Sequence, residues 1–314
     1  MPSYSGNFTL PTQMQAIAAD NWPAPFVPLP SRSAIFGFGY TGSVTNITNL
    51  VSDTGVVAND VTSAAVSARF WTSGAGYGGD KAIFGYGRNS SFAATSTTNL
   101  VSNTGVLASD VSNAATALQR RAAASYGGDK AIFGFGFSLT NGINLVSNTG
   151  VLASDSTSVA TAKYQLAAAG YGTDKAIFGF GTPSDASYTN ITNLVSNTGV
   201  VATDTAGVGT ARNSLAASTF GGDKAIFGYG TTGSAVSMSN LVSNTGVVAT
   251  DTTGVGTARY GLAGAGYGTD RGIFGYGTGY TNITNLVSNT GVVATDTTGV
   301  GTARAYLGAS SFGS

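Results

Sequence analysis

A short apolar run enclosed by glycines recurs along the chain. It reads KAIFGYG at residues 81–87, and close variants surround an Ile in five other places. The six Ile residues are Ile35, Ile83, Ile132, Ile177, Ile226 and Ile273. Successive members are separated by 48, 49, 45, 49 and 47 positions. Apolar runs of this length bounded by glycine are typical of buried strands. The pattern therefore predicts six copies of one strand-containing unit.

The fifth and sixth copies indicate how one repeat divides into elements. Small residues alternate at 258–268, an apolar run follows at 271–277, and two further strand-like segments lie at 281–289 and 291–297. The last two are joined by Ser-Asn-Thr-Gly, in which Asn starts a turn and Gly supplies a residue that takes positive φ. Each repeat is thus predicted to contain four strands, the last two forming a hairpin.

A period of 45–49 residues made of strand-like segments indicates a β-propeller with one blade per repeat. We expect an all-β fold in which residues 32–314 form a six-bladed propeller of four-stranded blades, and residues 1–31 form an N-terminal arm. The repeats start near 33, 80, 129, 174, 223 and 270. The Ala- and Gly-rich strand should lie innermost, where blades crowd. Because the chain begins at a second strand and ends at a first one, residues 303–314 are expected to complete the first blade and close the ring.

Composition excludes several kinds of chemistry. The chain has no Cys, His or Glu, which removes thiol nucleophiles, imidazole bases and the usual zinc ligands. Lys and Arg together number 14, and so do the acidic residues, so no net field favours nucleic acid or an anionic membrane. No apolar run is long enough for membrane insertion. We therefore predict no catalytic residues, no cofactor and no metal site.

The few charges recur at fixed positions of the repeat. One Asp column comprises Asp60, Asp110, Asp155, Asp204, Asp251 and Asp296, and a second comprises Asp80, Asp129, Asp174, Asp223 and Asp270. A column of bases comprises Arg69, Lys163, Arg212, Arg259 and Arg304, with Leu118 in the remaining copy. This repetition favours ion pairs and turn hydrogen bonds over a catalytic set, with metal binding by the Asp residues as the alternative. Asp110 is then expected to pair with Arg120 or Arg121.

Residues 257–304 resemble a kelch-type blade, in which an Arg ends one blade, a small-residue strand follows, and a hydrophobic strand ends in glycines before two more strands. The Gly-Gly doublet of that family is here Gly-aromatic-Gly, as in Gly275-Tyr276-Gly277, and its Trp in the last strand is absent. The resemblance implies a propeller over residues 32–314. Kelch propellers serve many tasks, so it implies no single function.

The N-terminal sequence SGNFTLPTQMQAIAADNWPAP, residues 5–25, resembles a segment that precedes repeat or adhesin domains in structural proteins of tailed bacteriophages, especially those of cyanobacteria and other aquatic bacteria. Virion proteins of such phages also carry kelch-like repeats. The resemblance implies a virion protein, made in the host cytoplasm, whose arm docks onto another virion protein through Phe8, Leu10, Met14, Ile17 and Trp22. The alternative is that the arm packs on its own propeller.

The connection between the second and third strands varies in length. It spans 8 to 12 residues from the last Gly of the apolar run to the next Asn, whereas the rest of the repeat keeps 33 or 34. Variable loops at one end of a constant scaffold are where binding specificity usually lies. We predict ligand or partner contacts from Tyr40, Arg88, Phe92, Phe137, Tyr188 and Tyr280. The alternative is that each of these side chains anchors its own loop.

These observations favour a non-enzymatic virion protein, specifically a tail fibre or tail-associated adhesin that contacts a host surface polysaccharide or receptor. A capsid decoration or tail-assembly protein without host contact, and a soluble lectin-like module, are the alternatives. A glycan hydrolase or lyase would need two asymmetric carboxylates about 5 to 9.5 Å apart. Only Asp20, Asp53 and Asp185 lie outside the Asp columns, so an enzyme is not expected.

Overall fold

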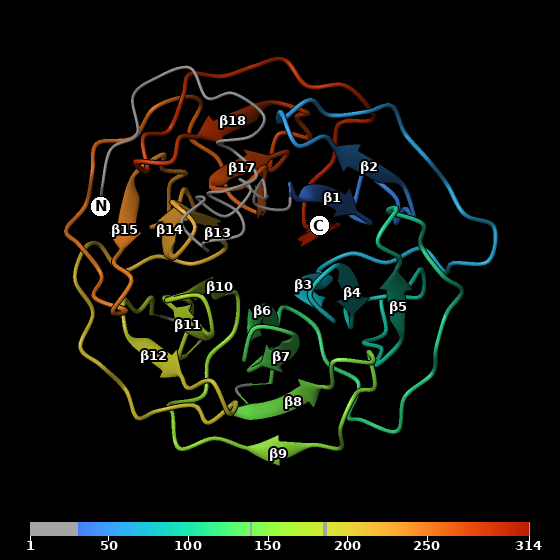
Figure 1. The fold of residues 1–314 in the computed structure, drawn as a ribbon, viewed down its shortest axis with the longest axis horizontal. Helices are drawn as coiled ribbons and strands as arrows, with labels where there is room; N and C mark the ends of the chain where they lie inside the picture. Colours follow the sequence, from blue (N-terminus) through green and yellow to red (C-terminus); the bar gives the residue numbers. More distant parts are fainter. Residues whose placement is uncertain (1–30, 139, 185–186, 314) are drawn as a thin grey trace, which may run out of the picture.

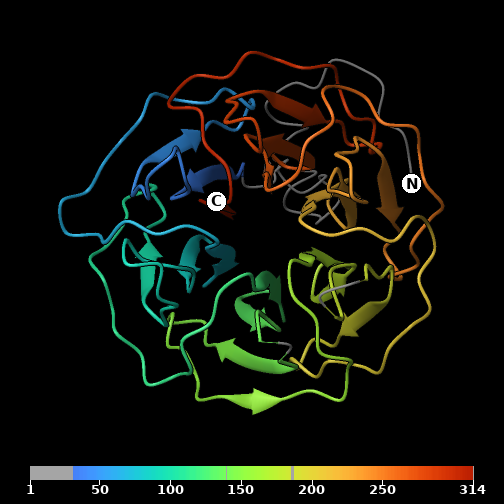
Figure 2. The same ribbon diagram turned by 180° about the vertical axis from the view of Figure 1, so that it is seen from behind.

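Nineteen β-strands make up the secondary structure of the computed structural model, which describes residues 31–138, 140–184 and 187–313. The strands form six antiparallel sheets, five with three strands and one with four, and no helix occurs in these residues. The sheets are arranged around a common centre, as Figure 1 and Figure 2 show from opposite sides. The expected all-β class is confirmed, and the arrangement is propeller-like.

Each sheet has an inner strand of small residues, a middle apolar strand and an outer strand. The inner strands are β19 (Gly308–Phe312), β3 (Ser73–Tyr77), β6 (Ala122–Tyr126), β10 (Ala167–Tyr171), β13 (Ala216–Phe220) and β16 (Ala263–Tyr267). The middle strands are β1 (Ser33–Gly37), β4 (Lys81–Gly85), β7 (Lys130–Gly134), β11 (Lys175–Gly179), β14 (Lys224–Gly228) and β17 (Arg271–Gly275). The outer strands are β2 (Thr48–Val51), β5 (Thr98–Val101), β8 (Gly142–Val146), β12 (Thr192–Val195), β15 (Ser239–Val242) and β18 (Thr284–Val287).

The first sheet is assembled from opposite ends of the described chain. β19 pairs antiparallel with β1, so that Ile35 lies opposite Ser310, and β2 pairs with the other side of β1. The predicted pairing of the C-terminal strand with the first repeat is therefore present. β19 also packs beside β3 and β16, the inner strands of the two neighbouring sheets.

The predicted fourth strand is a strand in one sheet only, where β9 (Ser156–Thr157) pairs with β8. In the other five sheets the corresponding segment makes isolated bridges, such as that of Val51 with Val57. Beside these bridges the Asn49 side chain donates to Ala58 O at 3.0 Å, and Asn144 makes the same contact with Ala153 O in the sheet that contains β9. The expectation of four-stranded blades is therefore wrong for five of the six sheets.

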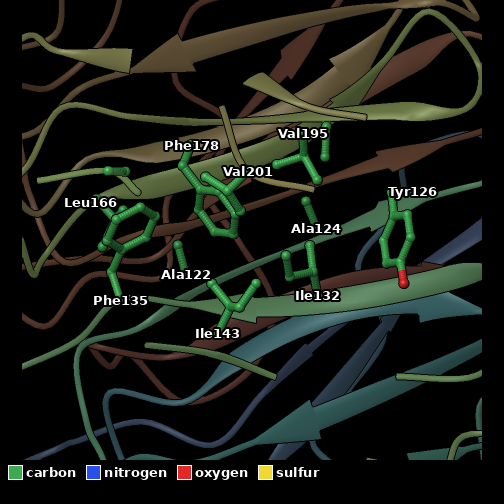
Figure 3. Packing of buried hydrophobic residues seen from close by; sticks show 12 residues of the cluster. Ala122, Ala124, Tyr126, Ile132, Phe135, Ile143, Leu166, Phe178, Val195 and Val201 are labelled. Atoms are coloured by element: carbon green, nitrogen blue, oxygen red, sulfur yellow. The ribbon is translucent and has the colours of Figure 1, made fainter. Parts of the chain in front are cut away.

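Buried side chains fill the space between successive sheets. Figure 3 shows one such cluster, in which Ala124, Ile132 and Phe135 of one sheet meet Phe178 and Val195 of the next. Full burial of a Phe or Ile side chain contributes about 1.5–3 kcal/mol. Each cluster therefore contributes more to stability than any single polar contact between the same sheets.

The glycine that begins each Gly-aromatic-Gly triplet makes room for a ring of the next sheet. A Cβ on Gly37 would lie 3.0 Å from the Phe84 ring, and one on Gly275 would lie 2.8 Å from the Phe36 ring. The same contact recurs between the other successive sheets, at Gly85, Gly134, Gly179 and Gly228. The repeated sequence phrase is thus required by the close approach of neighbouring sheets.

The aromatic residue of each triplet holds a buried cation of the next sheet. Arg304 lies over Tyr276 at 4.2 Å and donates from Nη2 to Asn49 Oδ1 at 2.7 Å. The backbone of Tyr276 is left-handed, with φ of 66°, which costs about 1–2 kcal/mol. A desolvated cation–π contact contributes about 2 kcal/mol and offsets that strain. The equivalent cations are Arg69, Arg121, Lys163, Arg212 and Arg259.

Arg121 supplies the buried cation of its sheet, because Leu118 occupies the base-column position of this repeat and carries no charge. Its guanidinium lies over Tyr86 at 4.2 Å, so a side chain three residues later fills the same site. Asp110 pairs instead with Arg69, at 3.5 Å. The predicted partner of Asp110 is therefore wrong, because this carboxylate belongs to the sheet that Arg69 enters.

Each Asp of the first column ties an incoming connection to its sheet. Asp296 accepts hydrogen bonds from Thr257 N at 3.0 Å and Thr257 Oγ1 at 2.6 Å, and it lies 4.0 Å from Arg259. Equivalent bonds from Thr or Ser reach Asp60, Asp110, Asp155, Asp204 and Asp251. Hydrogen bonds from Asn144 and Thr116 hold the pKa of Asp155 below its ordinary value. The structural role predicted for this column is thus present.

Candidate functional site

The inner strands surround the centre of the molecule. The residues at the two ends of these strands form two rims, which we call the front rim and the back rim. The front rim consists of the residues Trp71, Arg120, Gln165, Ser214, Gly261 and Tyr306, which precede the inner strands. The back rim consists of the glycines that follow these strands, Gly78, Gly127, Gly172, Gly221, Gly268 and Gly313. A cavity lies at each end.

The back rim repeats the same contacts in every sheet. Each rim glycine donates from its backbone N–H to a C=O of a neighbouring sheet at 2.7 Å, from Gly78 to Asp129 through to Gly313 and Asp80. Ion pairs with the preceding Asp, at 2.7–3.2 Å, are made by Lys81, Lys130, Lys175 and Lys224. A cavity of about 130 Å³ is lined by small residues of all six inner strands and by these charges. This end therefore presents repeated copies of one surface.

The front rim keeps one backbone conformation but changes its side chains. All six residues are left-handed, with φ between 52° and 62°. Backbone hydrogen bonds join successive members, such as Trp71 N to Tyr306 O at 2.7 Å and Ser214 N to Gln165 O at 2.8 Å. No two repeats carry the same side chain at this position. A constant frame thus positions six different groups.

These differences divide the front end into two halves. In the sheets of β1, β4 and β7, the rim residue and the residue after the Gly-aromatic-Gly triplet are large, namely Tyr306, Trp71, Arg120, Tyr40, Arg88 and Phe137. In the sheets of β11, β14 and β17, the same positions hold Gln165, Ser214, Gly261, Thr182, Thr231 and Thr278. An aromatic and basic half therefore faces a small and polar half.

The large side chains pack together into one aromatic patch. It comprises Tyr40, Phe70, Trp71, Arg88, Phe92, Arg120, Phe137, Tyr164, Tyr280 and Tyr306. The ring of Trp71 lies 4.6 Å from that of Phe70. Tyr40 contacts Phe70 at 5.3 Å, and its ring also lies 6.3 Å from Phe92 and 6.2 Å from Tyr280. Loops and rim residues of neighbouring sheets therefore form one continuous surface.

Two arginines lie on the faces of these rings. Arg120 lies 3.8 Å from the ring centroid of Trp71 and 5.0 Å from that of Phe137. Arg88 lies 5.7 Å from Trp71 and 5.8 Å from Phe92. A guanidinium stacked on a ring keeps its in-plane N–H donors directed outward. The patch thus combines apolar surface with cationic donors.

The front rim surrounds a hollow of about 80 Å³. Its lining includes the residues that follow the rim, among them Leu166, Leu215, Leu262 and Leu307. Burial, together with the hydroxyl of Tyr260, raises the pKa of Tyr306 to about 12, so this hydroxyl remains a donor at neutral pH. An apolar floor beside aromatic rings and a few convergent polar groups has the composition of a ligand site.

Five of the six predicted contact residues lie in the aromatic patch, namely Tyr40, Arg88, Phe92, Phe137 and Tyr280. Phe92, Phe137 and Tyr280 pack on neighbours and still keep 37–50% of their surface exposed. Tyr188 is 40% exposed, and its described contacts include no ring of the patch. Asp53 accepts a hydrogen bond from Ser31 Oγ at 3.1 Å. The predicted docking residues Phe8, Leu10, Met14, Ile17 and Trp22, and also Asp20 and Asp185, lie outside the described residues.

The front rim itself is absent from the sequence prediction, including Trp71, Arg120 and Tyr306. Variation in loop length does not identify the rim, because the residue type at this position changes between repeats while the length of the segment stays the same. It stands two residues after the aligned base column, where the six copies read Trp, Arg, Gln, Ser, Gly and Tyr. A comparison of side-chain identity, position by position, reveals this column.

Other kinds of site are not found in the described residues. They contain no cluster of three or more His, Cys, Asp or Glu side chains able to hold a metal ion. They also contain no helix with the length and apolar character needed to span a membrane. No protein-family model matches this chain, and no curated protein matches it.

Proposed function

We propose that the six sheets are the blades of a closed six-bladed β-propeller formed by residues 32–314, with residues 1–31 as a separate arm. Three sets of contacts support this proposal. Back-rim hydrogen bonds, glycine–phenylalanine contacts and buried cations each run from sheet to sheet, and each set includes the sheet that contains β19. A closed ring leaves only short, protected sheet edges. It also gives the front rim a rigid base.

We propose further that the protein is a non-enzymatic binding protein whose ligand lies across the front rim. The observation that carries this proposal is the division of the front end into an aromatic half and a polar half. At the rim position and the position after the triplet, free variation would scatter the large side chains among the six sheets, but here they lie in three adjacent sheets. Tyr164 and Tyr280, from the sheets of β11 and β17, extend the patch at its two edges. Aromatic rings stack on sugar rings or partner side chains, while hydroxyl and amide groups supply hydrogen bonds.

The geometry suits a tail fibre or tail-associated adhesin of a bacteriophage particle, as the N-terminal resemblance implies. Arg32 exchanges backbone hydrogen bonds with Gly268 of the back rim, at 2.7 and 3.0 Å. Arg32, the first residue of the proposed propeller, therefore lies at the end opposite the aromatic patch. An arm docked onto another virion protein leaves the patch facing the host surface.

Binding of the purified protein to host cells and to their extracted surface polysaccharide tests the binding function. Replacing Trp71 and Phe92 together by Ala removes two stacking rings, and we expect binding to weaken about thirtyfold, or about 2 kcal/mol. Tyr188→Ala is the matched control, because this exposed ring lies outside the patch. Equal binding by the double variant and the wild type contradicts the proposal.

Immunogold electron microscopy of particles of the encoding phage tests the location. Label on the tail supports the adhesin. Label on the head instead supports a capsid decoration protein, and absence from the particle supports a soluble lectin-like module. A protein found in the particle that binds no cell or polysaccharide is a structural component without host contact.

A further inference from the structure

We infer that the front rim binds an acidic saccharide, a sugar ring that carries a carboxylate or sulfate group, with Arg88 as the anion-binding residue and Arg120 as a neighbouring positive charge. This inference rests on the proposed binding function and specifies its ligand class. The ring of Trp71 lies beneath both guanidinium groups and supports them, and the exposed rings of Phe92, Phe137 and Tyr280 supply the stacking surface.

The argument from charge begins with the other bases. The buried cations of the repeat column meet Asn or Asp side chains, and the lysines of the back rim pair with Asp. Arg88 differs, since it is half-buried and makes no ion pair with a described carboxylate. Its Nε is buried without an acceptor among the described residues. A planar anion accepts two N–H donors of such a guanidinium in a bidentate arrangement.

Arg120 adds a second positive charge on the same indole. The Trp71 Nε1–H is also buried and has no acceptor among the described residues, and no carboxylate belongs to the aromatic patch. A neutral ligand that excludes water here would desolvate the guanidinium of Arg88 and leave its Nε–H and the indole N–H of Trp71 without an acceptor, which is costly. A negatively charged ligand offsets that cost.

The shape of the site favours a saccharide chain over an enclosed small molecule. Pockets that enclose small ligands measure about 300–1,000 Å³, whereas the front hollow measures about 80 Å³. The ligand must therefore extend over the patch, as a polymer does. A nucleic acid requires a row of cations along successive phosphates, but the polar half offers Ser214, Thr182, Thr231 and Thr278. Hydroxyl and amide groups match the hydroxyls of a sugar chain.

Three polymers with one backbone test this inference, namely dextran, carboxymethyl-dextran and dextran sulfate, measured by calorimetry or biolayer interferometry. The wild-type protein should bind at least one charged polymer tenfold or more tightly than dextran. Arg88→Gln should remove most of that preference. Lys130→Gln is the matched control, because it deletes the same charge at the back rim. Arg88→Lys keeps the charge but loses the pair of N–H donors that binds a planar anion. Its preference for the charged polymer should fall between those of the wild type and Arg88→Gln.

The outcomes separate this inference from the function on which it rests. Preference for the carboxymethyl or the sulfate polymer identifies the anion. Dextran binding that equals the charged polymers and depends on Trp71 preserves the binding function but overturns the acidic ligand. An equal loss of the preference for charged polymers in Arg88→Gln and Lys130→Gln also overturns it. So does tighter binding of a single-stranded DNA of 12 thymidines, which would identify a nucleic acid as the ligand. Binding of none of the three polymers overturns it as well. Thermal unfolding of each variant confirms that the fold is intact.

Discussion

The two rims lie at opposite ends of the same six strands, yet only one of them varies. At the back rim a Cβ on Gly127 would lie 2.9 Å from Asn197 O, so the backbone of the next sheet excludes a side chain. At the front rim the backbone is equally fixed, but residues as different as Trp71 and Ser214 adopt the same left-handed conformation. Side-chain identity is therefore constrained where it mediates contact between sheets and free at the rim that we propose binds a ligand. Freedom at one end allows a symmetric repeat to form an asymmetric site.

The largest expected effect comes from a change that breaks both rims together. Deleting residues 303–314 removes β19, the hydrogen bond from Gly313 to Asp80 at the back rim, and that from Trp71 to Tyr306 at the front rim. It also exposes the paired edge of β1. We expect this variant to lose cooperative unfolding, measured by circular dichroism during thermal denaturation.

A permuted chain provides the control for that deletion. In this variant residues 303–314 are joined directly before Arg32, so that β19 and β1 form a local hairpin like those of the other sheets. All contacts between sheets are retained, and a cooperative transition close to that of the wild type is expected. A truncated chain that unfolds as cooperatively as the permuted one would mean that the rims do not depend on β19.

A paired substitution sharpens the comparison between the rims. Gly127→Ala places a Cβ at φ of 62° and against Asn197 O, and we expect a loss of about 2 kcal/mol in the free energy of unfolding. Ser214→Ala keeps the Cβ and removes a hydroxyl that has no hydrogen-bond partner among the described residues, so a change within about 0.5 kcal/mol is expected. Urea denaturation measures both variants. Equal losses would show that the front rim is as constrained as the back rim.

The smallest expected effect at neutral pH concerns the column of buried cations. Burial lowers the pKa of Lys163 to about 8 against the opposing charge of Asp204, whereas the ordinary value is 10.5. Between these values the unfolded chain binds the proton and the folded chain does not, so stability rises with pH from about 8 to 10.5. Lys163→Arg should remove this rise below pH 10, because burial lowers the pKa of the equivalent Arg212 only to about 10.

The same variant should also be more stable near pH 7, by about 1 kcal/mol, because a guanidinium makes more hydrogen bonds than an ammonium in this position. Arg212 donates from two nitrogens, to Asn240 Oδ1 at 2.7 Å and to Tyr229 O at 2.8 Å. Lys163 donates from its single nitrogen to both Asn193 Oδ1 and Ile191 O. Urea denaturation from pH 7 to 10 measures both effects. Identical profiles for the two proteins would show that Lys163 is not the titrating group.

The candidate site is predicted in part from the sequence. Loop-length variation identifies Phe92 and Tyr280, because insertions are tolerated where a loop leaves the scaffold. It also includes Tyr188, which lies apart from the aromatic patch, since loop length carries no information on which loops meet. It omits Trp71 and Arg120, because these residues lie in a segment of constant length whose direction toward the front end depends on the left-handed backbone.

The sequence by itself determined the six-fold repeat, the all-β class and the inner place of the Ala- and Gly-rich strands, because hydrophobic spacing and glycine positions are local properties. It also predicted the pairing of β19 with β1, because the first and last repeats are complementary fragments of one unit. Only the tertiary structure decided that most fourth segments make isolated bridges and that Arg121 replaces the charge missing at Leu118. It alone brought the large side chains of neighbouring sheets together at the front rim. Contacts between side chains of different sheets depend on how the sheets pack around one centre, which no local pattern encodes.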